Sequence, residues 1–76
     1  MYSTTWCGYC VRLKRFLERE GIPFREINIE HDEDAAEFVM DANRGNRTVP
    51  TVRFPNDTTL TNPSPGQVLE QLARSA

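Results

Sequence analysis

The hydrophobic pattern of the chain changes its period at Gly21, from a helical spacing to an alternating one. Before this point, Leu13, Phe16 and Leu17 have the i, i+3, i+4 spacing of one helix face, which predicts a helix from about Gly8 to Glu20. Glycine tolerates the left-handed backbone that ends many helices, and the proline two residues later cannot continue one. We therefore expect the helix to end here and the chain to continue in another conformation.

The segment after Gly21 has the pattern of a strand that is buried on one side. Between Arg25 and Ile29, Ile27 and Ile29 share one side of the predicted strand, and polar residues occupy the other. Another short strand is expected at Met1 to Thr4, ahead of the helix. Two strands that are joined through a helix form a parallel pair with a right-handed crossover, so this part of the chain predicts a β-α-β unit.

The middle of the chain predicts a second helix, from about Asp34 to Asn43. Asp34 and Glu37 fit a capping pattern at its start, and Gly45 is expected to end it. The residues that would form its inner face are Ala35, Phe38, Val39 and Ala42.

The last part of the chain predicts a β-hairpin and a third helix. Strands are expected at Thr51 to Phe54 and at Thr58 to Thr61, joined by a turn-rich stretch at residues 55–57. Ser64 then fits a helix cap, with a proline in the first helical position and Gln67 placed to complete a capping box. The apolar face of this helix would consist of Val68, Leu69, Leu72 and Ala73.

This order of elements, β-α-β-α-β-β-α, predicts an α/β fold: a small mixed four-stranded sheet with helices on its faces. A chain of 76 residues is expected to form a single domain, 1–76, and 38% hydrophobic residues suit a small core. The net charge of −2 offers no electrostatic reason to expect a nucleic acid or an anionic membrane as partner. No signal peptide or membrane span is recognisable, so the default compartment is the cytoplasm.

Both cysteines of the chain, Cys7 and Cys10, lie at the expected start of the first helix. The unpaired N–H groups of a helix N-terminus stabilise an anion, and the thiolate is the form of cysteine that attacks disulfides. Cys7 is therefore the expected nucleophile. Cys10 lies one turn further on the same helix face, where it can form a disulfide with Cys7 and should be the less accessible of the two.

The sequence resembles one protein family over essentially its whole length. The W-C-G-Y-C of residues 6–10 and the T-V-P of residues 48–50, before a hairpin and a last helix, are similar to the glutaredoxin branch of the thioredoxin superfamily. Within that branch, the mixed motif together with N-R-T-V-P-T-V and T-L-T-N-P-S is most similar to the mycoredoxins, which use mycothiol rather than glutathione. The resemblance implies a thioredoxin-like fold, a cis peptide bond before Pro50 and Trp6 partly in the core and partly at the rim of the site.

The chain departs from many glutaredoxins where they bind the charged ends of glutathione. Thr4 stands in place of a lysine, and residues 61–64, T-N-P-S, stand in place of two glycines and an acid. Mycothiol carries sugar hydroxyls instead of those carboxylates, so amide and hydroxyl side chains suit it better. Besides Cys7 and Cys10, the resemblance and this chemical match point to substrate-binding roles for Trp6, Gly8, Tyr9, Thr48, Val49, Pro50, Thr61, Asn62 and Ser64.

The expected function is reduction of mycothiol mixed disulfides on proteins or small thiols, with Cys10 resolving the adduct on Cys7 or assisting. The resemblance implies a cytoplasmic monomer with no bound cofactor and no metal. Mycothiol is the implied co-substrate. The implied partners are mycothiolated proteins and an upstream mycothiol-disulfide reductase, with neither a nucleic acid nor a membrane among them.

Two other functions stay open at this stage. One is a dithiol electron donor that a thioredoxin reductase reduces directly, as in donors to ribonucleotide reductase; such donors carry a W-S-G-F-R-P stretch that this chain lacks. The other is a carrier of zinc or of an iron–sulfur cluster. Zinc in proteins normally has four ligands, and His31 is the one further soft ligand besides the two cysteines.

Overall fold

The structure, a computed structural model, describes residues 1–75. Its elements follow the predicted order: β1 (Tyr2–Ser3), α1 (Gly8–Arg19), β2 (Ile27–Asn28), α2 (Glu33–Ala42), β3 (Thr51–Arg53), β4 (Thr59–Thr61) and α3 (Pro65–Ser75). Each strand is shorter than its sequence pattern indicated, because the alternation of side chains continues beyond the residues that pair.

The four strands form one mixed sheet in the order β2-β1-β3-β4. β1 runs parallel to β2, with Tyr2 opposite Ile27, and antiparallel to β3, with Tyr2 opposite Thr51. β3 and β4 are the antiparallel hairpin that the sequence predicted. This topology confirms the expected β-α-β unit and places the first strand in the centre of the sheet.

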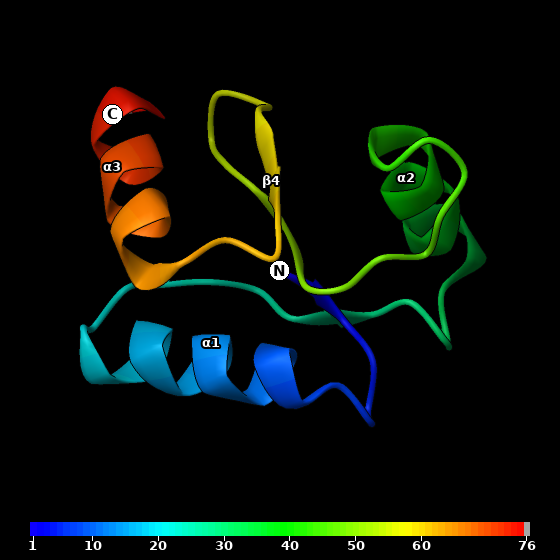
Figure 1. The fold of residues 1–76 in the computed structure, drawn as a ribbon, viewed down its shortest axis with the longest axis horizontal. Helices are drawn as coiled ribbons and strands as arrows, with labels where there is room; N and C mark the ends of the chain where they lie inside the picture. Colours follow the sequence, from blue (N-terminus) through cyan, green and yellow to red (C-terminus); the bar gives the residue numbers. More distant parts are fainter. Residues whose placement is uncertain (76) are drawn as a thin grey trace.

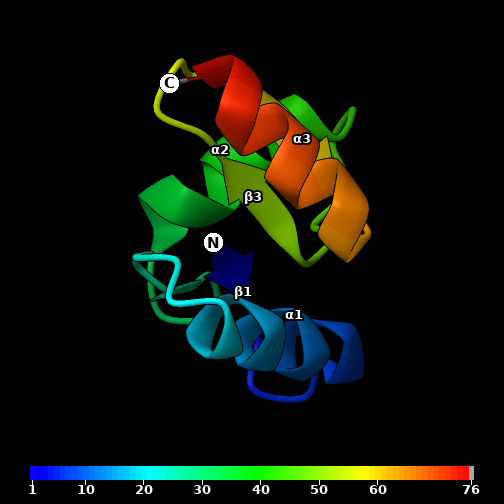
Figure 2. The ribbon, with the colours of Figure 1, turned by 90° about the vertical axis from the view of Figure 1, so that its left-hand side faces the viewer.

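The helices cover both faces of the sheet. α1 and α3 lie on one face and α2 lies on the other (Figures 1 and 2). Each face has its own cluster of buried side chains. The α1/α3 side holds Met1, Leu13, Leu17, Val52, Phe54 and Val68; the α2 side holds Tyr2, Ile29, Ala35, Ala36 and Val39.

The ends of α1 and α3 follow from local sequence as predicted. Gly21 has a φ of +67°, the left-handed conformation that glycine adopts without a steric penalty. This turn lets the N–H of Ile22 donate to the carbonyl of Leu17 over 2.9 Å. At α3, the N–H of Gln67 donates to Ser64 Oγ (3.2 Å) and the N–H of Ser64 donates to Gln67 Oε1 (2.8 Å). The predicted capping box is therefore confirmed.

Three helix details in the sequence interpretation were wrong. α2 begins one residue earlier than predicted, because Asp32 and not Asp34 caps it, accepting from the N–H of Ala35 at 3.0 Å. Ala42 of α2 is exposed, and Ala36 takes a buried place instead. In α3, Leu69 and Ala73 are exposed, so this helix contacts the sheet along a narrower stripe than the sequence suggested.

Candidate functional site

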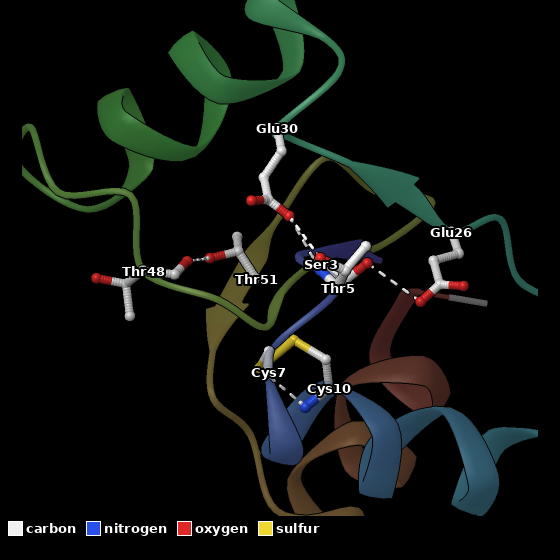
Figure 3. The surroundings of a disulfide bond; sticks show 8 residues. All are labelled: Ser3, Thr5, Cys7, Cys10, Glu26, Glu30, Thr48 and Thr51. Atoms are coloured by element: carbon white, nitrogen blue, oxygen red, sulfur yellow. Dashed lines mark hydrogen bonds between the residues drawn. A yellow bond between two sulfur atoms is a disulfide. The ribbon is translucent and has the colours of Figure 1, made fainter.

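Cys7 is the residue that caps the N-terminus of α1. Its Sγ accepts a hydrogen bond from the N–H of Cys10 over 3.1 Å, as the dashed line in Figure 3 shows. The two sulfurs form a disulfide, and the Cα atoms are 5.2 Å apart, within the range that disulfides require. Placement of the first sulfur at the helix N-terminus is the geometry that the C-x-x-C spacing predicted. In the reduced protein, the same N–H can stabilise a thiolate on Cys7.

The two sulfur-bearing side chains differ in their exposure to solvent. Cys7 is 6% exposed and Cys10 is 2% exposed, which confirms that Cys10 is the less accessible of the pair. This difference is in the direction expected if Cys7 is the sulfur that meets an incoming disulfide and Cys10 acts after it.

Two large aromatic side chains stand at the surface beside the cysteines. Trp6 is 73% exposed and Tyr9 is 61% exposed, so the expected partial burial of Trp6 in the core was wrong. Trp6 precedes the helix in an exposed loop, and Tyr9 lies on the solvent side of its first turn together with the exposed Gly8. The guanidinium of Arg12 lies 5.8 Å from the centroid of the Tyr9 ring, at a cation–π distance.

A carboxylate from the segment after β2 holds the loop that leads to Cys7. The N–H and the hydroxyl of Thr5 both donate to Glu30 Oε1, over 3.1 and 3.0 Å (Figure 3). These bonds, the backbone one first, lower the pKa of Glu30 below its usual value. Sequence reasoning missed this role, because nothing in the local pattern of either segment links Glu30 to Thr5.

A second carboxylate ties β1 to α1 further from the sulfurs. Glu26 accepts from Ser3 Oγ at 3.1 Å and from Lys14 Nζ at 2.9 Å. The hydrogen bond from Lys14 is the main cause that lowers the pKa of Glu26, and it raises the pKa of Lys14. The ammonium group of Lys14 is thus paired with Glu26, the residue before β2.

The loop before β3 has the expected cis peptide bond between Val49 and Pro50. Pro50 is buried, and its carbonyl accepts from the N–H of Asn62 over 2.7 Å, which joins this loop to the end of β4. Val49 is half-buried. The exposed side chain of Thr48 points away from the disulfide in Figure 3, while its carbonyl accepts from Thr51 Oγ1 at 2.8 Å.

A groove of 380 Å³ opens between α1 and the start of α3. It brings together three of the residues assigned to substrate binding, Tyr9, Asn62 and Ser64, and it adds two that the sequence reasoning did not assign, Arg12 and Gln67. The other residues that line it are Leu13, Pro63 and Pro65. A larger cavity of 490 Å³ lies against the cluster of Met1, Leu17 and Val68. Among the described residues, neither cysteine lines this cavity or the groove, and the groove is the one whose wall includes a residue of the W-C-G-Y-C motif, Tyr9.

Asn62 and Thr61 differ in what they present to the groove. Asn62 has a φ of +46°, a left-handed conformation that asparagine tolerates better than most residues, and its side chain is exposed in the groove wall. The hydroxyl of Thr61 instead donates to Asn43 Oδ1, and Thr61 is not among the lining residues. The structure therefore separates these two neighbours, which the sequence reasoning had grouped together.

Thr4, which stands where many glutaredoxins carry lysine, is buried at 8% exposure. Its Oγ1 has no hydrogen-bond partner among the described residues. A buried hydroxyl without a partner is unfavourable by about 1–3 kcal/mol.

We expect Thr4→Val to raise the free energy of unfolding by about 1 kcal/mol, because valine has nearly the same shape and no polar atom to desolvate. Urea denaturation of the oxidised protein measures this change. Thr5→Val is the matched control, since it removes a hydroxyl that does have a partner, Glu30, and should not stabilise the protein. Destabilisation by Thr4→Val would show that its hydroxyl is paired in solution.

Among residues 1–75, no group of three or more histidine, cysteine, aspartate or glutamate side chains is arranged to hold a metal ion. Within the same residues, no helix is long and apolar enough to span a membrane.

Comparison with known proteins gives consistent matches. The sequence model of the glutaredoxin family matches residues 1–58. A Mycobacterium tuberculosis protein named as a glutaredoxin is 53% identical over 76 residues, covering 100% of this chain and 90% of the relative. Mycoredoxin 1 of Corynebacterium glutamicum is 40% identical over 72 residues, covering 95% of this chain and 89% of the relative. A glutaredoxin of Pseudomonas aeruginosa is 42% identical over 53 residues, or 68% of this chain and 61% of its own.

Proposed function

The chain belongs to the glutaredoxin family, with the thioredoxin-like fold that its sequence predicted, and from this we propose that it reduces mixed disulfides between mycothiol and proteins or small thiols. The broader role, a glutaredoxin-like redox protein with a Cys7–Cys10 pair, follows from the family and from the disulfide. The choice of mycothiol is the proposal.

The observation that carries this choice is the chemistry of the groove beside Tyr9. Its polar side chains are the amides of Asn62 and Gln67 and the hydroxyls of Tyr9 and Ser64; Ser64 Oγ and Gln67 Oε1 also accept the capping bonds of α3. Arg12 is the one charged side chain among the described residues that line the groove. Amides and hydroxyls hydrogen-bond sugar hydroxyls well. Thr4, in the place of the family's lysine, is buried and offers no charge to a carboxylate. The 40% identity to mycoredoxin 1 supports the same choice.

In the first step, the Cys7 thiolate attacks the mycothiol sulfur of a protein–mycothiol disulfide. The bond between the two sulfurs of the substrate breaks, and the protein thiol leaves with the electron pair and takes up a proton. Cys7 then carries mycothiol in a new disulfide. The N–H of Cys10, which bonds Cys7 Sγ in the oxidised form, is positioned to stabilise the thiolate that begins this step.

In the second step, the thiolate of a second mycothiol attacks the mycothiol sulfur of the adduct. Mycothiol disulfide forms, and Cys7 is released as a thiolate for the next cycle. A mycothiol-disulfide reductase would return the product to two thiols. Cys10 provides a side route: its thiolate attacks the Cys7 sulfur, releases mycothiol and forms the Cys7–Cys10 disulfide seen in this structure.

We place the reaction in the cytoplasm, because reduction of disulfides is sustained where thiol pools are kept reduced. We also propose that residues 1–76 act as one domain and as a monomer, with mycothiol the co-substrate and no bound cofactor. The residues we assign to the bound thiol are those of the motif (Trp6, Gly8, Tyr9), of the loop before β3 (Thr48, Val49, Pro50) and of the segment after β4 (Asn62, Ser64). Thr61, the last residue of β4, supports this segment through its bond to Asn43.

One observation favours a second function. The Cys7–Cys10 disulfide is the oxidised form that a dithiol donor coupled to a thioredoxin reductase would pass through. In that role both cysteines are essential, whereas the mycothiol route through a second thiol needs Cys7 alone.

The variant Cys10→Ser separates the two functions. We expect it to keep turnover of a mycothiol mixed disulfide and to prefer it over the glutathione equivalent by at least about tenfold, or about 1.4 kcal/mol in transition-state binding. Each thiol is supplied with its own reductase, and the wild-type protein is the reference. Loss of both activities, with wild type still reducing dithiol targets, would favour the thioredoxin-reductase donor.

A further inference from the structure

The side chain of Asn43, at the C-terminus of α2, makes three hydrogen bonds to three different segments. Its Nδ2 donates to the carbonyl of Val39 at 2.8 Å and to Thr51 Oγ1 at 3.0 Å. Its Oδ1 accepts from the hydroxyl of Thr61. One amide therefore connects the last turn of α2, the start of β3 and the end of β4.

Two of these contacts lead directly to the loop before β3. Thr51 is fully buried, and its Oγ1 both accepts from Asn43 and donates to the carbonyl of Thr48 over 2.8 Å. The hydroxyl of Thr51 thus links the side chain of Asn43 to the backbone of Thr48 through two hydrogen bonds. The residues of this loop lie outside the strands and are held by one hydrogen bond from Thr51 Oγ1 to the carbonyl of Thr48 and by one from the N–H of Asn62 to the carbonyl of Pro50.

The third contact leads to the wall of the groove. Thr61 precedes Asn62, whose N–H donates to the carbonyl of Pro50 over 2.7 Å. The backbone of Asn62 therefore joins Pro50 directly, and Thr61 lies opposite Thr51 in the β3–β4 pair. Asn43 adds side-chain hydrogen bonds to both Thr51 and Thr61. Asn43 itself is half-buried and is not among the residues that line the groove.

We propose that Asn43 is a positioning residue that acts beside the β3–β4 pairing to fix the spacing between residues 48–50 and residues 61–64, and through it the affinity for the bound thiol. It acts through Thr51 and Thr61 and touches neither sulfur. The assignment of these two segments to thiol binding rests on the proposed function. Their connection through one amide does not depend on which thiol is bound.

The role makes a distinctive kinetic prediction. Replacement of Asn43 by alanine leaves Cys7 and its cap unchanged, so the chemical step should keep its rate once the substrate is bound. The two binding segments keep their backbone contacts but lose the shared side-chain contact with Asn43, so their spacing becomes less fixed and binding should weaken. We expect Asn43→Ala to raise KM for the mixed disulfide by about tenfold, the effect of one or two lost hydrogen bonds, while kcat changes by less than about threefold.

Asn46→Ala is the matched control. Asn46 is a nearby asparagine whose Nδ2 donates to the backbone carbonyl of Asn43 at 3.1 Å, and among the described residues its side chain makes no hydrogen bond to either binding segment. Its removal should leave KM and kcat as in wild type. Asn43→Asp is the second variant. It has nearly the same shape and still accepts from Thr61, but it loses the donor to Thr51 and to the carbonyl of Val39, so it should also raise KM.

The experiment measures KM and kcat for wild type, Asn43→Ala, Asn43→Asp and Asn46→Ala, with the mycothiol and the glutathione mixed disulfides of one small thiol. The rate of Cys7 alkylation by iodoacetamide is measured in parallel. A raised KM in both Asn43 variants, with unchanged kcat and alkylation rate, supports the proposal. An unchanged KM, an equal effect of Asn46→Ala, or a joint loss of kcat and alkylation rate would overturn it.

The two substrates keep this test separate from the proposed function. A wild-type preference for the glutathione disulfide would refute mycothiol as the natural thiol. In that case, KM of Asn43→Ala and of wild type is compared with the glutathione mixed disulfide as substrate. A raised KM in the variant would support the role of Asn43, and an unchanged KM would overturn it. If Asn43→Ala does not fold, the same comparison with Asn43→Asp decides the role.

Discussion

Replacement of Cys7 by serine is expected to reduce the turnover of mixed disulfides to the uncatalysed rate. The attacking group is a thiolate, and a serine hydroxyl does not ionise near neutral pH, so no nucleophile remains at the cap of α1. Cys10 cannot take over, because it is 2% exposed and lies behind the residue that the substrate meets first. Steady-state assays with the mycothiol mixed disulfide measure the loss.

The comparison with Cys10→Ser makes this result specific. Both variants lose the Cys7–Cys10 disulfide, so in both the unfolded chain gains the same conformational freedom. Their circular dichroism and denaturation midpoints should therefore be similar. The activities should differ widely, with Cys10→Ser retaining turnover. An active Cys7→Ser beside an inactive Cys10→Ser would reverse the assignment of nucleophile and resolving cysteine.

Leu17→Ala should be among the most destabilising substitutions in the chain. Leu17 is 3% exposed in the cluster between α1 and α3, and truncation of a buried leucine to alanine lowers the free energy of unfolding by about 2–5 kcal/mol. Domains of this size have a total stability of only about 4–11 kcal/mol. With a urea dependence of about 1 kcal/mol per M, the unfolding midpoint should fall by roughly 2 M or more.

Leu69→Ala provides the matched control on the neighbouring helix. Leu69 is 46% exposed on α3, so the same change of side chain removes little buried surface. Its effect should remain within about 0.5 kcal/mol, as for most surface substitutions. Similar midpoints for the two variants would mean that Leu17 is not in a tightly packed core in solution.

Leu17 and Leu69 show what the spacing of apolar residues in a helix can and cannot predict about burial. Both occupy positions with apolar helical spacing, and the sequence analysis placed both on inner faces. The spacing of apolar residues in the sequence shows which side of a helix faces the core. How many residues on that side are buried depends on how closely the helix approaches the sheet. α3 contacts the sheet through Val68 and Leu72, which leaves Leu69 outside.

The features that the sequence alone determined are those that arise from neighbouring residues. The order of elements follows from hydrophobic period and from helix stops such as Gly21, and the cap of α3 follows from Ser64 and Gln67, three residues apart. The placement of Cys7 at a helix N-terminus is local in the same sense, because a C-x-x-C spacing covers one helical turn. These interactions form wherever the chain takes the right local conformation.

The tertiary structure decided which distant residues meet around that motif. Glu30 bonds Thr5 across 25 positions, and Asn43 bonds Thr61 across 18. Each of these side chains, taken locally, looks like an ordinary polar residue at the end of an element. Their partners are set by the fold: the pairing of β1 with β2 brings Glu30 to the loop before Cys7, and the packing of α2 on the sheet brings Asn43 to the end of β4. Hydrogen bonds are short-ranged and directional, so only the folded arrangement of the backbone determines which of them form.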